Sequence, residues 1–354
     1  MDIYKKYMRP LLFRFDAENV HNLAKSVLQR HQLIRTLAGD AMLVRDERLH
    51  VDLGGLRIEN PVGLGAGFDK DCEMVDGLMR LGFGYVVTGS VMFNPSPGNP
   101  RPRMVRDPER EALFSCMGLP SKGLDYVVRR LKSRNQGLVP LIINFNAMDL
   151  KEYLKCFEVL QPLGDAIEIS LFCPNRVGDE GYFLDPNSAG TLFEEIAVRK
   201  KKPLFFKILG YASKKERERR LDLIDRAIKY PVEGITITPE SRVKEKRLSI
   251  GQGTLTGKPK FPGALEMVQD VYEIAKDNCH IKASGGISSP EDAFNIIAAG
   301  ASTVEIVTGF MYEGWRLAQN INHGLVNLMD KYNIKDVTAL RGTRLKIDHT
   351  GALE

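Results

Sequence analysis

The chain contains 354 residues, of which 43% are hydrophobic and 27% are charged, a balance typical of a soluble globular protein that buries a full core. Its formal net charge of +5 is small and dispersed, which argues against nucleic acid as a partner and fits anionic ligands or an anionic membrane surface equally well. Five cysteines without a CxxC pair or a zinc-like cluster with the six histidines predict reduced thiols, no metal site and a cytoplasmic location.

Residues 1–45 are predicted to form an N-terminal extension of two amphipathic helices, with Asp16 as the cap between them. Lysines and arginines are interleaved with its apolar positions, and no run reaches the roughly 18 apolar residues that span a bilayer. Basic amphipathic helices either pack on their own domain or lie on a membrane surface. Both interpretations stay open, so peripheral attachment to the inner face of the cytoplasmic membrane is the alternative location.

From Asn60 onward, strand and helix patterns alternate eight times. The predicted strands are short, rich in β-branched residues and nearly continuously apolar, as strands covered on both faces must be. They are residues 61–64, 85–89, 140–144, 166–171, 204–208, 234–238, 280–284 and 303–308. Eight units favour a closed (β/α)8 TIM barrel, an α/β fold, over an open sheet. We assign residues 46–340 to this barrel and residues 341–354 to a polar C-terminal tail.

Two glycine-rich stretches follow the last two predicted strands, residues 283–287 (ASGGI) and 307–309 (VTG). Barrels of this kind often bind phosphate there, on free backbone N–H groups. Glycines also occur in ordinary turns, so each stretch alone is a weak signal. Their placement after adjacent strands favours a phosphate site.

Three further side chains at predicted strand ends are candidates for chemistry. Lys207 ends an otherwise apolar strand, so it must face a ligand or pair with a carboxylate. Lys70 holds a similar position after an earlier strand. Cys173, just after the fourth strand, is a candidate proton-transfer group, although a lone cysteine is more often a small buried apolar side chain.

Several spaced motifs are shared with one known family. They are residues 60–70 (NPVGLGAGFDK), 82–85 (GFGY), 97–103 (PGNPRPR), 257–259 (GKP), 285–286 (GG) and 299–302 (AGAS). With these motifs the chain resembles dihydroorotate dehydrogenases over nearly its whole length, particularly the membrane-associated, quinone-reducing class. The resemblance implies an FMN-dependent oxidoreductase acting on CH–CH groups.

The resemblance also implies roles for individual residues. Cys173 falls on the catalytic base, which is normally serine in the membrane class, and Lys70 would lie by the flavin and substrate, with Lys207 beside the flavin. The implied FMN-binding residues are Ala66, Gly67, Ser90, Asn144, Lys207, Thr238, Gly257, Gly285, Gly286, Thr308 and Gly309.

The substrate positions depart from the family pattern. The family holds the orotate ring with several asparagines, of which only Asn175 remains. Ser115, Ser170 and Pro239 replace the others, and each unpaired polar group would cost about 1–3 kcal/mol. Glu240 is a new charge beside the site that we hypothesise could receive an amine.

His21 and Arg106 match the positions that face the quinone in that class, whereas Val307 replaces its tunnel tyrosine. A lone histidine on a helix is more often structural.

We therefore predict an FMN enzyme that acts on a C–C or C=C bond next to a carbonyl, on a carbonyl-bearing small molecule other than orotate or dihydroorotate. One alternative is a genuine dihydroorotate:quinone oxidoreductase, with Ser115 and Ser170 working through waters. A second is a non-catalytic FMN-binding protein at a membrane surface. A third, a phosphate-binding isomerase, would be colourless.

Overall fold

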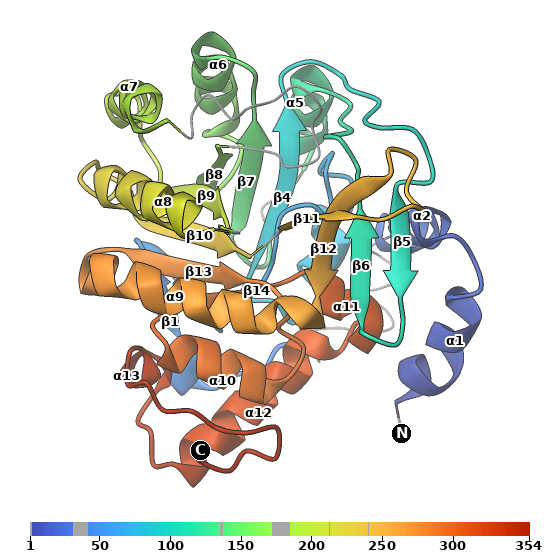
Figure 1. Ribbon diagram of the computed structural model, residues 1–354, viewed down its shortest axis with the longest axis vertical. Coiled ribbons are helices and arrows are strands. Elements are labelled where there is room, and N and C mark those ends of the chain that lie inside the picture. Colours follow the sequence, from blue (N-terminus) through green and yellow to red (C-terminus); the bar gives the residue numbers. More distant parts are fainter. Residues whose placement is uncertain (1, 31–41, 135–136, 172–184, 212, 240) are drawn as a thin grey trace.

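The computed structural model describes residues 2–30, 42–134, 137–171, 185–211, 213–239 and 241–354 (Figure 1). The N-terminal segment begins with a π-helical turn, η1 (Tyr4–Met8), and continues through α1 (Arg9–Leu12) into α2 (Ala17–Leu28). The Asp16 carboxylate caps α2 by accepting the backbone N–H groups of Glu18 and Asn19, both at 3.0 Å. The predicted N-terminal helices and their cap are thus confirmed.

The predicted barrel is confirmed as eight parallel strands closed in the order β10-β13-β14-β3-β4-β7-β8-β9. The first and last residues of the strands lie close to those of the predicted ranges. They are β3 (Val62–Leu64), β4 (Tyr85–Met92), β7 (Leu141–Asn146), β8 (Ala166–Ser170), β9 (Leu204–Leu209), β10 (Gly234–Thr238), β13 (His280–Ser284) and β14 (Thr303–Ile306).

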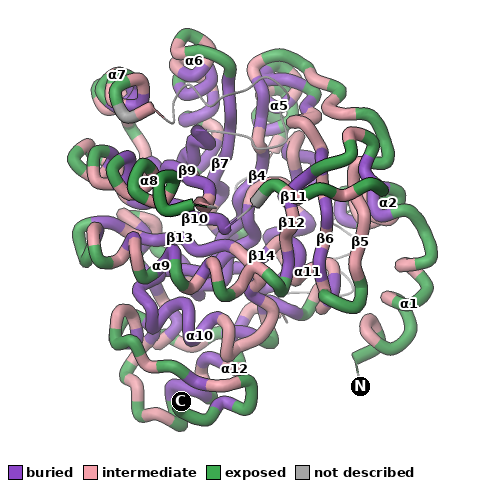
Figure 2. The backbone as a smooth tube through the Cα atoms, in the orientation of Figure 1, coloured by how far each residue is buried: buried purple, intermediate pink, exposed green. Residues whose placement is uncertain are grey.

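Helices surround this barrel, and their exposed faces turn outward while the strands are buried (Figure 2). The main ones are α5 (Leu124–Lys132), α6 (Leu150–Leu160), α7 (Pro186–Ala197), α8 (Lys214–Ala227), α9 (Phe261–Ala275), α10 (Pro290–Ala298) and α12 (Leu317–Lys331). Shorter turns are η2 (Glu47–Leu49), α4 (Val75–Leu78), η4 (Lys258–Lys260), η5 (Lys276–Asn278), α11 (Thr308–Glu313) and α13 (Val337–Leu340).

Two additional sheets were not predicted from the sequence. A hairpin, β1 (Val51–Leu53) and β2 (Leu56–Ile58), precedes the barrel. An antiparallel sheet in the order β11-β12-β6-β5 is inserted in two barrel loops and lies beside α2 (Figure 1). Its strands are β5 (Met104–Asp107), β6 (Ala112–Ser115), β11 (Ser241–Lys244) and β12 (Gln252–Gly257).

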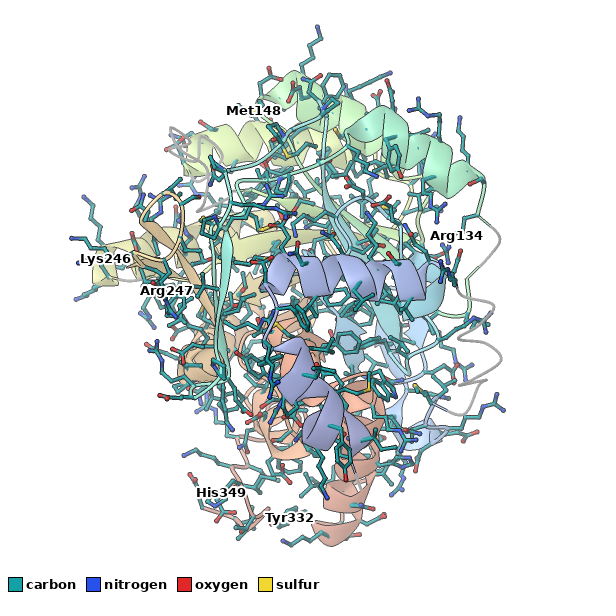
Figure 3. The ribbon with its side chains drawn as sticks, turned by 90° about the vertical axis from the view of Figure 1, so that its right-hand side faces the viewer. Arg134, Met148, Lys246, Arg247, Tyr332 and His349 are labelled. Atoms are coloured by element: carbon teal, nitrogen blue, oxygen red, sulfur yellow. The ribbon has the colours of Figure 1, made fainter. Side chains whose placement is uncertain are left out.

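The N-terminal helices lie across one side of the molecule, with α1 next to α2 (Figure 3). Among the described residues, no helix combines the length and apolar character needed to cross a bilayer.

The last residues of the chain, 341–354, fold back onto the barrel. Although most of their side chains are exposed, Ile347 is buried. The Asn295 side chain of α10 bonds both its carbonyl oxygen, at 2.7 Å, and its N–H group, at 2.9 Å.

Candidate functional site

A cavity of about 1070 Å³ lies between the carboxyl ends of the barrel strands and the N-terminal helices. Most of the residues singled out from the sequence line this one cavity: His21, Ala66, Gly67, Lys70, Ser90, Arg106, Ser115, Ser170, Lys207, Thr238, Gly257, Gly285, Gly286, Thr308 and Gly309. Asn144 lies behind the wall and is fully buried. Cys173, Asn175 and Glu240 lie outside the described residues.

The glycines after β13 form a tight wall of the cavity. Gly285 and Gly286 have φ angles of +122° and +77°, which L-residues with a side chain rarely adopt. A Cβ atom on Gly286 would lie 2.5 Å from the backbone nitrogen of Phe261, where no flexible side chain could move away. The close approach of two backbones therefore requires glycine here, in a shape that suits an anion held by main-chain N–H groups.

Lys70 and Asp69 shape the loop after β3. The Lys70 ammonium donates to the carbonyl oxygen of Gly67 at 2.6 Å, and burial together with the charge of Arg103 lowers its pKa. The Asp69 carboxylate accepts the backbone N–H groups of Glu73 at 2.9 Å and Met74 at 2.7 Å. Burial nevertheless raises the pKa of Asp69 to about 6. Asp69 therefore holds the loop that places Lys70 in the cavity.

Ser115 and Ser170, which were predicted to contact the substrate, are largely engaged inside the protein. The Ser170 hydroxyl accepts from Asn144 Nδ2 at 2.9 Å. Its carbonyl oxygen accepts from Asn146 Nδ2 at 2.8 Å and from the Tyr153 hydroxyl at 2.7 Å. Ser115 Oγ lies 3.3 Å from Thr254 Oγ1.

Asn146 is a cavity-lining amide that the sequence argument missed. The available signal was that Asn146 lies two residues after Asn144, so both side chains point to the same face of one strand. Its Oδ1 is buried without a hydrogen-bond partner among the described residues.

Charged residues that the sequence argument also missed lie in the barrel below the cavity. Lys282 donates to Glu168 Oε2 at 2.7 Å and to Glu305 Oε1 at 2.9 Å, and all three side chains are buried. Lys207 lines the cavity above them, and within the described part of the chain its ammonium has no hydrogen-bond or ion-pair partner. A charge inside an apolar strand was the signal that singled out Lys207, and it applied equally to Glu168 and Lys282.

Burial raises the pKa of Glu168, but the positive charges of Lys282 and Lys207 outweigh this effect and lower it overall. Burial also raises the pKa of Glu305, here as the dominant effect. Lys282, between two carboxyl groups, has a raised pKa despite its burial. These shifts favour the charged forms of Lys282 and Glu168, whereas burial disfavours the charged form of Glu305.

The N-terminal helices form the more apolar end of the cavity. The His21 ring packs edge-on against Phe68 with 5.0 Å between centroids. Burial lowers the pKa of His21 to about 4, and the nearby charges of Lys70 and Lys25 contribute, so its imidazole is neutral at pH 7. Arg106 lies over the Phe13 ring at 4.6 Å and donates to the Phe15 carbonyl oxygen at 2.8 Å. Arg106 thereby ties the segment after α1 to β5.

The cavity thus has a cationic, glycine-walled end in the barrel and an apolar end under the helices. The cationic end suits a planar cofactor that carries a phosphate, and the apolar end suits an uncharged ring. Sequence reasoning identified most of this wall, but it did not predict that the helices close the same cavity.

Comparisons with known proteins were made for the whole chain. The family model described as dihydroorotate dehydrogenase matches residues 48–329. A dihydroorotate dehydrogenase (quinone) of Roseiflexus sp. (strain RS-1) is 33% identical over 337 residues, which cover 90% of this chain and 92% of the relative. The enzyme of the same description from Coxiella burnetii (strain Dugway 5J108-111) is 34% identical over 337 residues, covering 89% of this chain and 95% of the relative.

Among solved structures, the chain is similar to that of DHODH in complex with ferulenol from Eimeria tenella. The TM-score is 0.77 at 26% identity, covering 88% of this chain and 94% of the other.

Proposed function

Because the chain belongs to the dihydroorotate dehydrogenase family, we propose that it uses FMN to move two hydrogens across a carbon–carbon bond next to a carbonyl, with a quinone as electron partner. The observation that carries this proposal is the single cavity that joins the cationic barrel end to the apolar helical end. The residues of the barrel end would hold the flavin, and those of the helical end would hold an apolar electron partner next to it.

The residues of the barrel end fit FMN. Backbone N–H groups of the glycine wall at Gly285 and Gly286 would hold the phosphate, and Lys207, whose ammonium has no hydrogen-bond or ion-pair partner among the described residues, would add a positive charge. The bound flavin would accept or deliver the hydride. Lys207 would stabilise negative charge on the reduced flavin, and Asn144, fixed from behind by Glu168, would support the wall.

On the substrate side, Lys70 would orient an anionic or carbonyl-bearing molecule. We assign proton transfer at the carbon next to the carbonyl to the thiol of Cys173, with Asn175 and Glu240 as further substrate contacts. A thiol has a reference pKa of about 8.5, so it can take or release a proton at modest cost near neutral pH.

We propose that the substrate is a carbonyl-bearing molecule other than dihydroorotate. The Ser170 hydroxyl and carbonyl are occupied by Asn144, Asn146 and Tyr153, and Pro239 offers no side-chain donor or acceptor. A cyclic imide would therefore leave polar groups unpaired, at a cost of about 1–3 kcal/mol each.

A second candidate substrate is dihydroorotate itself. The curated relatives, which cover about nine tenths of the chain, carry the description dihydroorotate dehydrogenase (quinone). Asn146, which lines the cavity, would be the available amide in place of those lost.

An anaerobic titration decides between the two substrates. The FMN-loaded protein is mixed with dihydroorotate while the visible flavin band is followed, with the Cys173→Ala variant as control. A band that persists for the wild type would support a changed substrate. Rapid bleaching that the control loses would instead favour dihydroorotate. An apoprotein that takes up no FMN would refute the proposed function.

The N-terminal helices would also hold the protein at a membrane surface, close to a quinone. Seven large apolar side chains of this region are exposed: Ile3, Tyr7, Met8, Leu11, Phe15, Leu23 and Val27. Lysines and arginines accompany them, as in helices that lie in a bilayer interface. Co-sedimentation with anionic vesicles should be strong for the wild type and weak for Leu11→Ser/Phe15→Ser. Equal binding of the two proteins would rule this surface out.

A further inference from the structure

Three charged side chains fill the barrel interior directly below the cavity, and we call them the charged floor: Glu168 of β8, Lys282 of β13 and Glu305 of β14. Their exposed fractions are 0%, 0% and 1%. Lys282 joins the two carboxyl groups, with hydrogen bonds of 2.7 Å to Glu168 and 2.9 Å to Glu305. The ammonium also lies 4.7 Å from the centroid of the Phe205 ring.

The charged floor is connected to the cavity wall at several points. Glu168 Oε1 accepts from Asn144 Nδ2 at 2.7 Å, and its second oxygen accepts from the Thr236 hydroxyl. Glu305 lines the cavity, and its Oε2 has no hydrogen-bond partner in the described part of the chain. Lys207 lies close enough to both carboxyl groups for its charge to lower the pKa of each.

Stability of the fold does not explain these charges. The interior of such barrels is usually filled by branched apolar side chains. A buried ion pair often contributes less stability than well-packed apolar residues of the same volume, because both charges lose their hydration. The reason for the charged floor therefore lies in the cavity that it faces.

We propose that Glu168 and Lys282 are positioning residues that set the electrostatic potential at the flavin end of the cavity and fix the orientation of the Asn144 amide. This inference rests on the proposed function, since it requires FMN in that end. Glu168 supplies a negative charge that partly offsets Lys207, whereas Lys282 offsets Glu168. The positive charges of Lys207 and Lys282 would favour the reduced, anionic form of the flavin, and the negative charge of Glu168 would oppose it.

The charges predict opposite effects for two variants. Glu168→Gln removes a negative charge and should make the flavin easier to reduce. Lys282→Met removes a positive charge and should make it harder to reduce. The double variant removes both charges and should return close to the wild type, and its neutral side chains still fill the barrel.

The test is a measurement of the flavin midpoint potential against reference dyes, on protein reconstituted with FMN. We expect the ratio of reduced to oxidised flavin at a fixed potential to rise about tenfold in Glu168→Gln, equivalent to about 30 mV for a two-electron couple. In Lys282→Met it should fall by a similar factor. The control is Glu233→Gln. Glu233 lies just before β10, at the opposite end of the barrel, and its carboxylate pairs with Lys200. This variant should leave the ratio of reduced to oxidised flavin unchanged.

Ratios within twofold of wild type in both single variants would overturn the inference while leaving the proposed function standing. A double variant shifted as far as Glu168→Gln would also overturn it, because a lost shape rather than a lost charge would then be responsible. If one single variant does not fold, the sign of the other decides. A wild-type protein that binds no FMN would refute the proposed function and this inference together.

Discussion

The Glu18→Gln substitution should loosen the N-terminal helix α2 from the barrel and thereby open one wall of the cavity. The Glu18 carboxylate accepts from Arg103 Nη2 at 2.7 Å and Nε at 3.1 Å, and from Arg101 Nη2 at 2.9 Å. Its side chain is 9% exposed and that of Arg103 13%, whereas Arg101 is 52% exposed. Solvent therefore screens the Arg101 contact, and Arg103 provides most of the attraction.

Hydrogen bonds to charged groups contribute about 1.5–3 kcal/mol each. Glutamine keeps one acceptor oxygen, so we expect the two bonds from Arg103 to lose about 2–3 kcal/mol of docking free energy in total. This corresponds to an increase of about 30- to 150-fold in the population with α2 detached.

Hydrogen–deuterium exchange of the α2 amides measures this population, because detached helices exchange rapidly. The matched control is Ser26→Ala on the exposed face of the same helix, where the hydroxyl donates to the carbonyl oxygen of Asn22 and to no other group of the described residues. The control should change the opening free energy by less than about 0.5 kcal/mol. If α2 in Glu18→Gln exchanges as slowly as in the control, Glu18 does not dock the helix.

Two further predictions concern the pH dependence of stability and the glycine wall. Glu73 is bonded by Lys122 and Tyr126, both at 2.8 Å, and by Lys25; although burial opposes it, these bonds lower its pKa from 4.5 to about 2. A depressed folded-state pKa stabilises the protein above the unfolded value, so stability should fall between about pH 4.5 and pH 2, and urea titrations of Glu73→Gln should show a shallower fall. Gly286→Ala should destabilise the fold by about 1–3 kcal/mol and weaken FMN binding at least tenfold, because the added Cβ meets the backbone of Phe261 at a positive φ. Gly190→Ala in α7, where no described atom beyond the adjacent residues and backbone of that helix lies within 4 Å of the added Cβ, should instead leave FMN affinity unchanged, and an equal loss in both variants would contradict the argument.

The barrel could be predicted because its strands are continuously buried. β7, for example, is buried at every position, and only a strand covered on both faces has such a run. The inserted sheet escaped prediction because β5 is half-buried throughout and carries no apolar run or clean alternation. Its structure depends on pairing with β6, which lies close in sequence, and on β12, more than a hundred residues away, which local patterns do not reveal.

The part of the site that lies at the carboxyl ends of the barrel strands could be predicted, whereas the part inside the strands could not. Lys70, which follows β3, and Lys207, which lies near the end of β9, were found because parallel strands bring their carboxyl ends together. Glu168 and Lys282 lie in the middle of β8 and β13, and they were missed because only polar residues at the predicted strand ends were taken as candidates. That His21 shares the cavity with Lys70 follows only from the way α2 docks.

The two ends of the cavity should tolerate amino-acid substitution to different extents. At the barrel end, a Cβ on Gly286 would meet the backbone of Phe261 and Lys207 lies near the charge of Glu168, so most substitutions there would disturb both shape and charge. At the proposed substrate end, the Ser115 and Ser170 hydroxyls bond to neighbouring side chains, whereas Asn146 donates to the Ser170 carbonyl oxygen and keeps its Oδ1 without a partner among the described residues. Polar groups that are already paired within the protein gain less free energy from binding a polar ring than free amides do. The barrel end is thus under steric and electrostatic constraint, whereas the two serines of the proposed substrate end are already paired within the protein, and we therefore expect the substrate to change more easily than the chemistry.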